Sequence, residues 1–148
     1  MALAVWWPSS RWVLLEGAQR RAVFLADAVE ELDLTDRVAV VCAAAEDAAR
    51  DVQYRAQVDL VVARSFGPAA AVAECGAAFL REGGRLVVSE PPESDPGRWP
   101  ADQLARFGLE LTAAPRSDNG SVVVLRQRHL AAEDVPRRAG IPARRPRW

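Results

Sequence analysis

Short apolar runs separated by polar stretches dominate the hydrophobic pattern of this chain. Four of these runs hold four to six residues each and are apolar nearly throughout. Such runs are typical of strands in a parallel sheet that helices cover on both faces. We therefore expect buried strands at residues 12–15, 38–42, 58–63 and 85–89.

Between these runs the apolar positions recur at helical spacing. The clearest case predicts a helix from about residue 20 to residue 34, with acidic side chains on its other faces. Its core positions are Leu25, Ala28, Val29 and Leu32. Small residues predict a second helix over 69–80, which can pack close to the sheet and is ended by Gly83 and Gly84. A helix over 1–7, a loop or short helix over 43–49 and a short helix over 101–107 complete the pattern.

The last part of the pattern differs, because two β-prone runs at 109–113 and 121–126 follow each other directly. Asp118, Asn119 and Gly120 lie between them, and an Asn-Gly pair in this position is a strong hairpin signal. Strands and helices alternate up to this point. We therefore expect an α/β fold, a Rossmann-like doubly wound sheet that is mostly parallel and carries a C-terminal antiparallel hairpin.

Charge adds information through its distribution rather than its total. The net charge is −1, and all 19 basic residues are arginine. Five of them fall in the last twelve residues, interleaved with proline. This divides the chain into one folded domain over 1–128 and an Arg/Pro-rich tail over 129–148. Extended arginine segments bind phosphate groups, so the tail is expected to contact a phosphate-bearing partner such as RNA; the alternative is a solvated tail that only packs Ile141 on the domain. The arginines concerned are Arg137, Arg138, Arg144, Arg145 and Arg147.

The cysteine and histidine positions give little support for a metal site or a redox site. Cys42 and Cys75 are far apart, with neither metal-ligand nor redox-pair spacing, and His129 is the single histidine. We expect no metal site and two buried free thiols. No apolar run is long enough to span a bilayer, and no basic region precedes the apolar start, so a cytoplasmic protein is expected.

Polar residues at predicted strand ends are the candidates for chemistry, since ligands of such sheets lie beyond the carboxyl ends of the strands. Glu16 directly follows the strand over 12–15, where a carboxylate can accept hydrogen bonds from both ribose hydroxyls of a nucleoside; the alternative is a surface acid in a loop. Glu46 follows the next strand, with an exposed acid at a helix start as its alternative. Arg64 ends a buried strand and needs a partner or water.

Several segments resemble one protein family. The segments LLEGAQRRAVFL, AAAED, VVARSFGP and RRAGIPARRPRW are similar to the guanine-N7 methyltransferases of small-subunit ribosomal RNA, also called glucose-inhibited division protein B. The likeness covers nearly the whole chain, and VVARSF and the C-terminal segment are its most specific parts.

This resemblance implies a methyltransferase fold, S-adenosylmethionine as cofactor and a guanine of ribosomal RNA as substrate. By position, Glu16 would hold the ribose, Ala45 and Glu46 the adenine side, and Arg64 the methionine or guanine end. No catalytic base is assigned, because guanine N7 is already a nucleophile and positioning supplies the rate.

Two departures from the family accompany the likeness. The family's N-terminal helices, first strand and Gly-rich loop have no counterpart here, so the chain is expected to be N-terminally truncated and to bind the cofactor weakly. The family's Leu-Lys-Gly after a strand is replaced where this chain reads Val87-Val88-Ser89-Glu90. Two other functions therefore stay open: a non-catalytic RNA-binding module, and a fragment of a longer enzyme whose start lies upstream.

Overall fold

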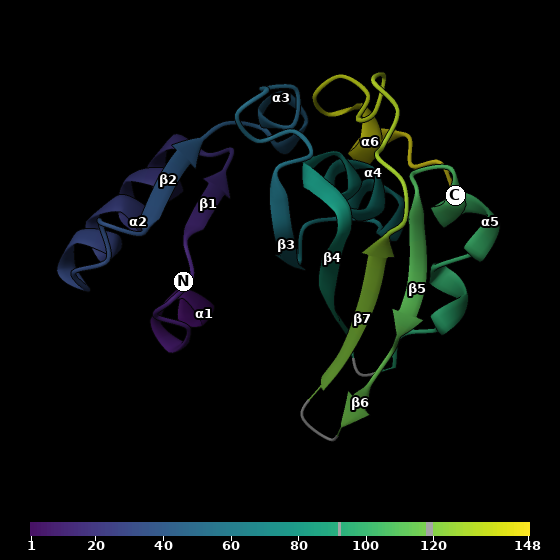
Figure 1. The fold of residues 1–148 in the computed structure, drawn as a ribbon, viewed down its shortest axis with the longest axis horizontal. Helices are drawn as coiled ribbons and strands as arrows, with labels where there is room; N and C mark the ends of the chain where they lie inside the picture. The colour runs from purple at the N-terminus through teal and green to yellow at the C-terminus, as the bar shows by residue number, and fades with distance from the viewer. Residues whose placement is uncertain (92, 118–119) are drawn as a thin grey trace. The chain divides into compact units, whose positions relative to one another are not determined.

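The computed structural model describes residues 1–91, 93–117 and 120–148. The chain divides into two compact units, unit 1 over Met1–Ala45 and unit 2 over Glu46–Trp148. Each unit is described by itself, and Figure 1 shows the elements of both. No helix in the described part of the chain is long and apolar enough to cross a membrane.

Unit 1 is a two-stranded parallel ribbon with two helices. Its elements in chain order are α1 (Ala2–Trp6), β1 (Trp12–Glu16), α2 (Gln19–Glu31) and β2 (Val38–Cys42). The register runs from Trp12 opposite Val38 to Glu16 opposite Cys42. A small core forms where Ala4, Val29 and Val38 meet. The expected strands and the long helix are confirmed here as elements, but the strands are only partly buried, since β1 has no buried residue and Val38 is the one buried residue of β2. Leu32, expected in the core, is half exposed.

Unit 2 contains one sheet of five strands. Its elements are α3 (Ala45–Ala48, which begins at the unit boundary), β3 (Val58–Arg64), α4 (Ala69–Phe79), β4 (Leu80–Glu90), a 3-10 turn (Pro96–Arg98), α5 (Ala101–Ala105), β5 (Leu109–Ala113), β6 (Arg116–Ser117), β7 (Gly120–Gln127) and α6 (Ile141–Arg144). The strand order is β3-β4-β7-β5, and β6 pairs with β7. The β3–β4 pair is parallel, whereas the pairs that β7 makes are antiparallel.

The alanine-rich helix α4 packs tightly against this sheet. Ten of its eleven residues are buried. A Cβ atom on Gly76 would lie 2.8 Å from a methyl group of Leu86, so the helix approaches the sheet as closely as a glycine allows. Leu80, Leu86 and Phe107 are fully buried and anchor the core below α4.

The glycine pair differs from its sequence-based expectation, whereas the hairpin agrees with its own. Gly83 and Gly84 lie inside β4 and do not end the helix, which stops at Phe79. Gly83 has a φ of +80°, and a Cβ on Gly84 would lie 2.9 Å from the carbonyl oxygen of Arg81, so the pair serves an irregular strand start. The expected antiparallel pairing of residues 109–113 with 121–126 is confirmed as the β5–β7 pair, and the short β6 also pairs with β7 next to the turn. Asp118 and Asn119 of that turn lie outside the described residues.

Candidate functional site

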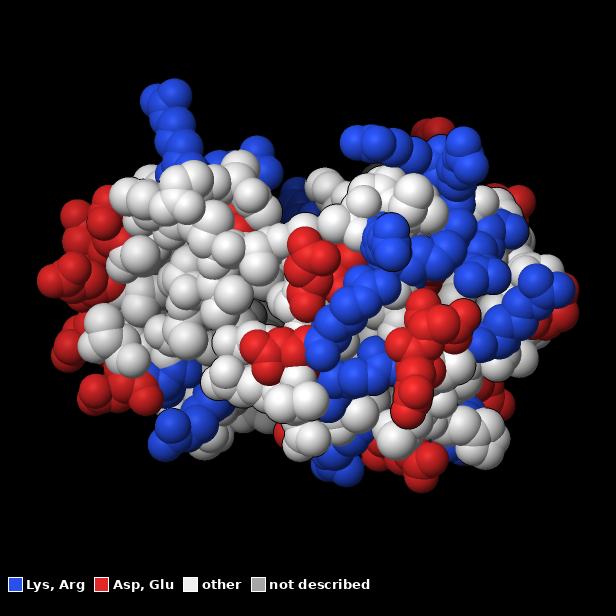
Figure 2. Space-filling model, turned by 90° about the horizontal axis from the view of Figure 1, so that it is seen from above, with Lys and Arg blue, Asp and Glu red and all other residues white. Residues whose placement is uncertain are grey.

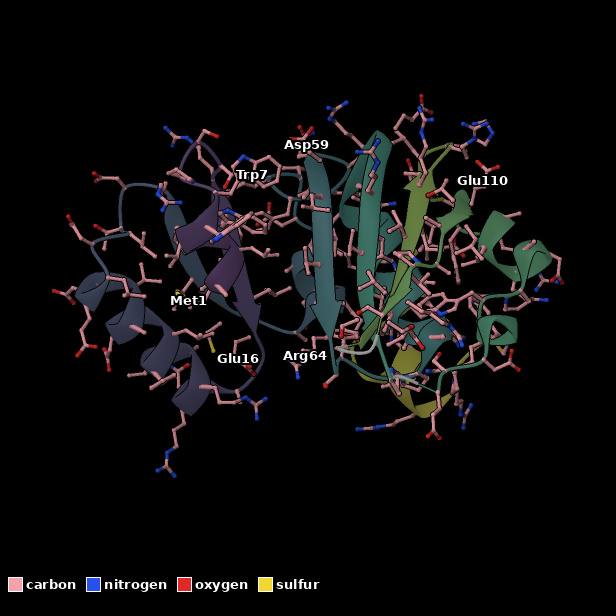
Figure 3. The ribbon with its side chains drawn as sticks, turned by 90° about the horizontal axis from the view of Figure 1, so that it is seen from below. Met1, Trp7, Glu16, Asp59, Arg64 and Glu110 are labelled. Carbon is pink, nitrogen blue, oxygen red and sulfur yellow. The ribbon has the colours of Figure 1, made fainter. Side chains whose placement is uncertain are left out.

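A pocket of about 520 Å³ lies at the carboxyl ends of β3 and β4 in unit 2. Figure 3 shows Arg64 at the carboxyl end of β3, with Asp59 near the start of the same strand. Ser65, next to Arg64, adopts a φ of +53°, which turns the chain sharply where the strand ends. The position is the one expected for ligands of an α/β sheet, and the volume falls in the usual range of small-molecule sites.

Aromatic and small apolar residues form much of the wall of this pocket. Phe66 is about half exposed, and Trp99 is 3% exposed. The indole N–H of Trp99 is buried and has no acceptor among the described residues. Trp99 is part of the core, so Phe66 is the accessible aromatic surface of the wall, and a flat ring of this kind is suited to stacking on a planar ring system.

Charged groups complete the wall, and they differ in how they are paired. Arg64 is exposed, and the described residues offer its guanidinium no hydrogen-bond or ion-pair partner. Glu90 is buried, and its Oε2 accepts hydrogen bonds from the hydroxyl of Ser94 and, at 2.6 Å, from Arg98. Within the described part of the chain, the pocket thus presents an unpaired cation and a held carboxylate to a ligand.

Glu16 in unit 1 lies at the carboxyl end of β1, as the sequence predicted. Its Oε1 accepts hydrogen bonds from the N–H of Ala18 at 2.8 Å and from Arg21 at 2.7 Å. The hydrogen bond from Arg21, together with the Ala18 N–H, lowers the pKa of Glu16 to about 2. The backbone N–H of Gly17 makes a smaller contribution to the same shift. The two hydrogen bonds from Ala18 and Arg21 both fall on Oε1, so Oε2 is the oxygen with more capacity for a hydroxyl-bearing ligand.

The lowered pKa of Glu16 gives a testable result. Arg21→Ala should raise this pKa from about 2 toward its ordinary value of 4.5, because the largest cause of the shift is removed. In the native protein the contribution of this pair to stability is complete above pH 4.5 and is lost as the pH falls toward 2. NMR titration of the side-chain carboxyl carbon measures both values; an unchanged midpoint in the variant would show that Arg21 does not hold this carboxylate.

Glu46 plays a different part from either of its expected ones. It is 7% exposed rather than a surface acid, and its Oε1 accepts the N–H of Gly140 at 2.9 Å. Its carbonyl oxygen accepts a hydrogen bond from Arg50. The side chain therefore fixes the C-terminal segment through Oε1, and a contact of Ala45 and Glu46 with an adenine ring stays a prediction.

A buried carboxylate in α4 holds the same segment, and sequence reasoning missed it. Glu74 is fully buried and accepts four hydrogen bonds from Arg137, one from the backbone N–H and three from the guanidinium, at 2.7–3.1 Å. Burial alone would raise the pKa of Glu74, but the bonds and charge of Arg137, helped by Arg147, leave it below its ordinary value. The signal was an acid in the middle of an otherwise apolar helix.

The segment over 129–148 is thus largely part of the fold. Arg55 donates to the carbonyl oxygens of Ala132 and Val135 at 2.7 Å. Trp148 packs against Phe107 with ring centroids 6.0 Å apart and donates its indole N–H to the carbonyl of Arg98. The guanidinium of Arg137 is bound to Glu74. RNA contact by this side chain stays a prediction, and a phosphate would have to compete with Glu74 for the guanidinium.

Three arginines of the segment remain open to solvent. Arg138, Arg144 and Arg145 are exposed, and their side chains have no ion-pair or hydrogen-bond partner among the described residues. Figure 2 looks onto the end of unit 2 that carries α3 and α6, and it shows blue arginine side chains across this surface with a few acidic ones between them. These three residues, which we call the α6 arginines, keep the predicted capacity for phosphate.

The two cysteines differ from each other. Burial, and then the nearby charges of Glu46 and Glu74, raise the pKa of Cys75 to about 12, so this thiol is inert near neutral pH. Cys42 is exposed, which corrects the expectation that both thiols are buried. Among the described residues no group of three or more His, Cys, Asp or Glu side chains could hold a metal ion.

Comparison with known proteins gives a consistent result. Residues 1–94 match the protein family described as GidB, rRNA small subunit methyltransferase G. Proteins named ribosomal RNA small subunit methyltransferase G are similar to this chain: that of Leuconostoc citreum is 30% identical over 99% of this chain and 63% of its own length, and that of Roseiflexus castenholzii is 32% identical over 99% and 64%. The chain therefore spans less than two thirds of the length of these relatives.

Solved structures agree at the level of the fold. The S-adenosylmethionine-dependent methyltransferase SibL covers 86% of this chain with 46% of its own, at a TM-score of 0.63 and 19% identity. The N,N-8-amino-8-demethyl-D-riboflavin dimethyltransferase of Streptomyces davawensis covers 84% with 44% of its own, at a TM-score of 0.64 and 21% identity. These likenesses confirm the expected α/β methyltransferase-like fold.

Proposed function

Because this chain belongs to the GidB family, rRNA small subunit methyltransferase G, we propose that it acts in methyl transfer from S-adenosylmethionine to N7 of a guanine in small-subunit ribosomal RNA. One observation carries the proposal. The carboxyl ends of the parallel strands β3 and β4 form a pocket that combines an exposed arginine, Arg64, with aromatic walls and a carboxylate. Such a pocket suits an unstacked nucleobase, which enzymes of this kind hold by stacking and edge contacts.

The chemistry asked of the protein is modest. The N7 lone pair forms the new bond to the methyl carbon, and the sulfonium sulfur keeps the electron pair of the bond that breaks. No proton has to move in this step, so no general base is needed. Holding the base at the right distance and angle is the main contribution of the side chains, and Phe66 and Arg64 are placed to hold it.

The residues of unit 1 fit the ribose of the cofactor. Glu16 is ionised at neutral pH, and the hydrogen bonds from Ala18 and Arg21 both fall on Oε1, so Oε2 has the capacity to accept from ribose hydroxyls. The cofactor supplies an activated methyl group when it is bound. The side chain of Glu46 does not fit the adenine role, because it is turned to Gly140. We propose Glu16 as the ribose ligand and the backbone near Ala45 as the adenine contact.

The test is methyl transfer to unmethylated small-subunit ribosomal RNA with a labelled methyl donor. We expect the label in 7-methylguanosine. Arg64→Ala should lower the rate about 10- to 100-fold, since a charged contact to the substrate is worth about 1.5–3 kcal/mol. Arg85→Ala is the matched control, because Arg85 is an exposed arginine in the middle of the adjacent strand β4 and outside the pocket lining; the rate of this variant should stay unchanged.

Equal rates for Arg64→Ala and Arg85→Ala would contradict the role given to the pocket. The absence of transfer together with retained RNA binding would favour the second candidate, a non-catalytic RNA-binding module. The exposed Arg138, Arg144 and Arg145 are the observation that supports this alternative.

A further inference from the structure

Glu90 lies in the segment Ser89-Glu90-Pro91, which stands where the resembled family tends to have Leu-Lys-Gly. It ends β4 opposite Ser121 of β7 and lines the pocket. Its side chain is only 3% exposed. Burying an acid costs free energy unless the charge is paired and hydrogen-bonded. A buried carboxylate cannot serve solubility as a surface acid does, so its place in the pocket wall suggests another role.

The two oxygens of this carboxylate are used unequally. Oε2 takes both internal donors, the Ser94 hydroxyl and the Arg98 guanidinium. Oε1 accepts no hydrogen bond from the described residues. It is not completely enclosed, so it keeps some access to solvent. Ser94 and Arg98 therefore hold the group in place while one oxygen, with two lone pairs, stays available to a ligand in the pocket.

An acceptor-only oxygen distinguishes the nucleobases by the donors that they present. Guanine carries two adjacent donors on its Watson–Crick edge, N1–H and the N2 amino group. Adenine and cytosine each place an acceptor beside their single amino group there, and uracil flanks its one N–H with two carbonyl oxygens. Only guanine therefore satisfies a carboxylate without bringing an acceptor against it.

We propose that Glu90 is the residue that selects guanine, by accepting hydrogen bonds from N1–H and the N2 amino group of a base in this pocket. The inference rests on the proposed function and adds the specificity residue to it. A base held by this edge keeps N7 on its opposite edge, uncommitted and free to react. Arg64 is then available for O6 or a phosphate, and Phe66 for stacking.

The test uses the full chain and two RNA heptamers, one with a single guanosine between uridine triplets and one with inosine in its place. Inosine lacks only the N2 amino group. Fluorescence anisotropy should show the guanosine heptamer bound about 5- to 100-fold more tightly by the native protein. In Glu90→Gln this ratio should fall to about 1. Glu93→Gln, which removes an exposed acid of the same loop outside the pocket lining, should keep the native ratio.

The outcomes separate this inference from the proposed function. Equal binding of both heptamers by the native protein would overturn the inference alone, and this comparison needs no variant to fold. A native ratio that persists in Glu90→Gln would also overturn it and leave Glu90 as a loop anchor for Arg98. If neither heptamer bound, the proposed function would fail, and the inference with it.

Discussion

Arg137→Ala should lower the free energy of unfolding of the full chain by about 3–5 kcal/mol. The substitution deprives Glu74, which is fully buried, of the three hydrogen bonds from the guanidinium. Two contacts of Glu74 remain in the variant: the backbone N–H of residue 137, and Arg147, whose Nε lies 3.7 Å from the carboxylate. The loss of stability should therefore lie toward the lower end of this range. Urea unfolding followed by circular dichroism measures the change.

The matched control for this prediction is Arg138→Ala. Arg138 is the next residue, is exposed and has no side-chain partner among the described residues, so its loss should change stability by less than about 0.5 kcal/mol. Equal effects of the two substitutions would contradict a structural role for the Glu74–Arg137 pair.

The pH dependence of the same comparison has a definite sign. In the native protein the lowered pKa of Glu74 contributes stability above the unfolded value of 4.5, and this is lost as the pH falls. In Arg137→Ala, burial should raise the pKa of Glu74, so that protonation in acid relieves the buried charge. The difference in stability between the two proteins should therefore narrow as the pH falls from about 7 toward 4.5; a constant difference would show that Glu74 is not the group affected.

A triple substitution of the α6 arginines, Arg138, Arg144 and Arg145 to Gln, should weaken RNA binding without unfolding the protein. Removing each arginine–phosphate pair should flatten the slope of log affinity against log salt by about 0.7 for single-stranded RNA, or about 2 in all. The matched control changes Arg85, Arg106 and Arg126 to Gln, which are exposed arginines on other parts of unit 2. If both triple variants flattened the slope equally, RNA binding would follow total charge rather than this surface.

The C-terminal segment over 129–148 is held to the fold by several buried contacts, so RNA binding by its arginines is tested by substitution and not by deletion. An Arg/Pro-rich tail could be deleted as a whole, but this segment is bound to the fold through Glu46, Glu74 and Arg55. Its removal would expose the buried carboxylates and the ring of Phe107. Only substitutions of the exposed arginines separate RNA binding from folding.

The apolar pattern was enough to predict the strands and the long helix, because short continuous apolar runs and amphipathic helices have different periods. It overestimated burial, since Val13 of β1 and Val62 of β3 are more than 40% exposed. It could not show that Gly83 and Gly84 lie within β4, since glycine ends helices and also fits irregular strand starts. Nor could it show which strands pair: among the described residues β1 pairs with β2 in unit 1, and unit 2 has the order β3-β4-β7-β5 with β6 beside β7.

Part of the candidate site could be predicted from local sequence position, and part could not. Glu16 and Arg64 directly follow apolar runs, so their place at strand ends could be read from position. Glu90 lies in the same kind of position, but its value as an acceptor depends on Ser94 and Arg98 holding one oxygen. Glu46 and Glu74 meet partners more than 60 residues away, and no local pattern encodes such pairs.

The most direct test of the central claim compares methyl transfer to two RNAs that differ at one atom position. One carries guanosine and the other 7-deazaguanosine, which keeps the Watson–Crick edge but has a carbon in place of N7. The account predicts similar binding of both RNAs and label only in the guanosine RNA, because N7 is the nucleophile and the pocket holds the base by its other edge. Equal labelling of both RNAs, or none in either, would contradict it.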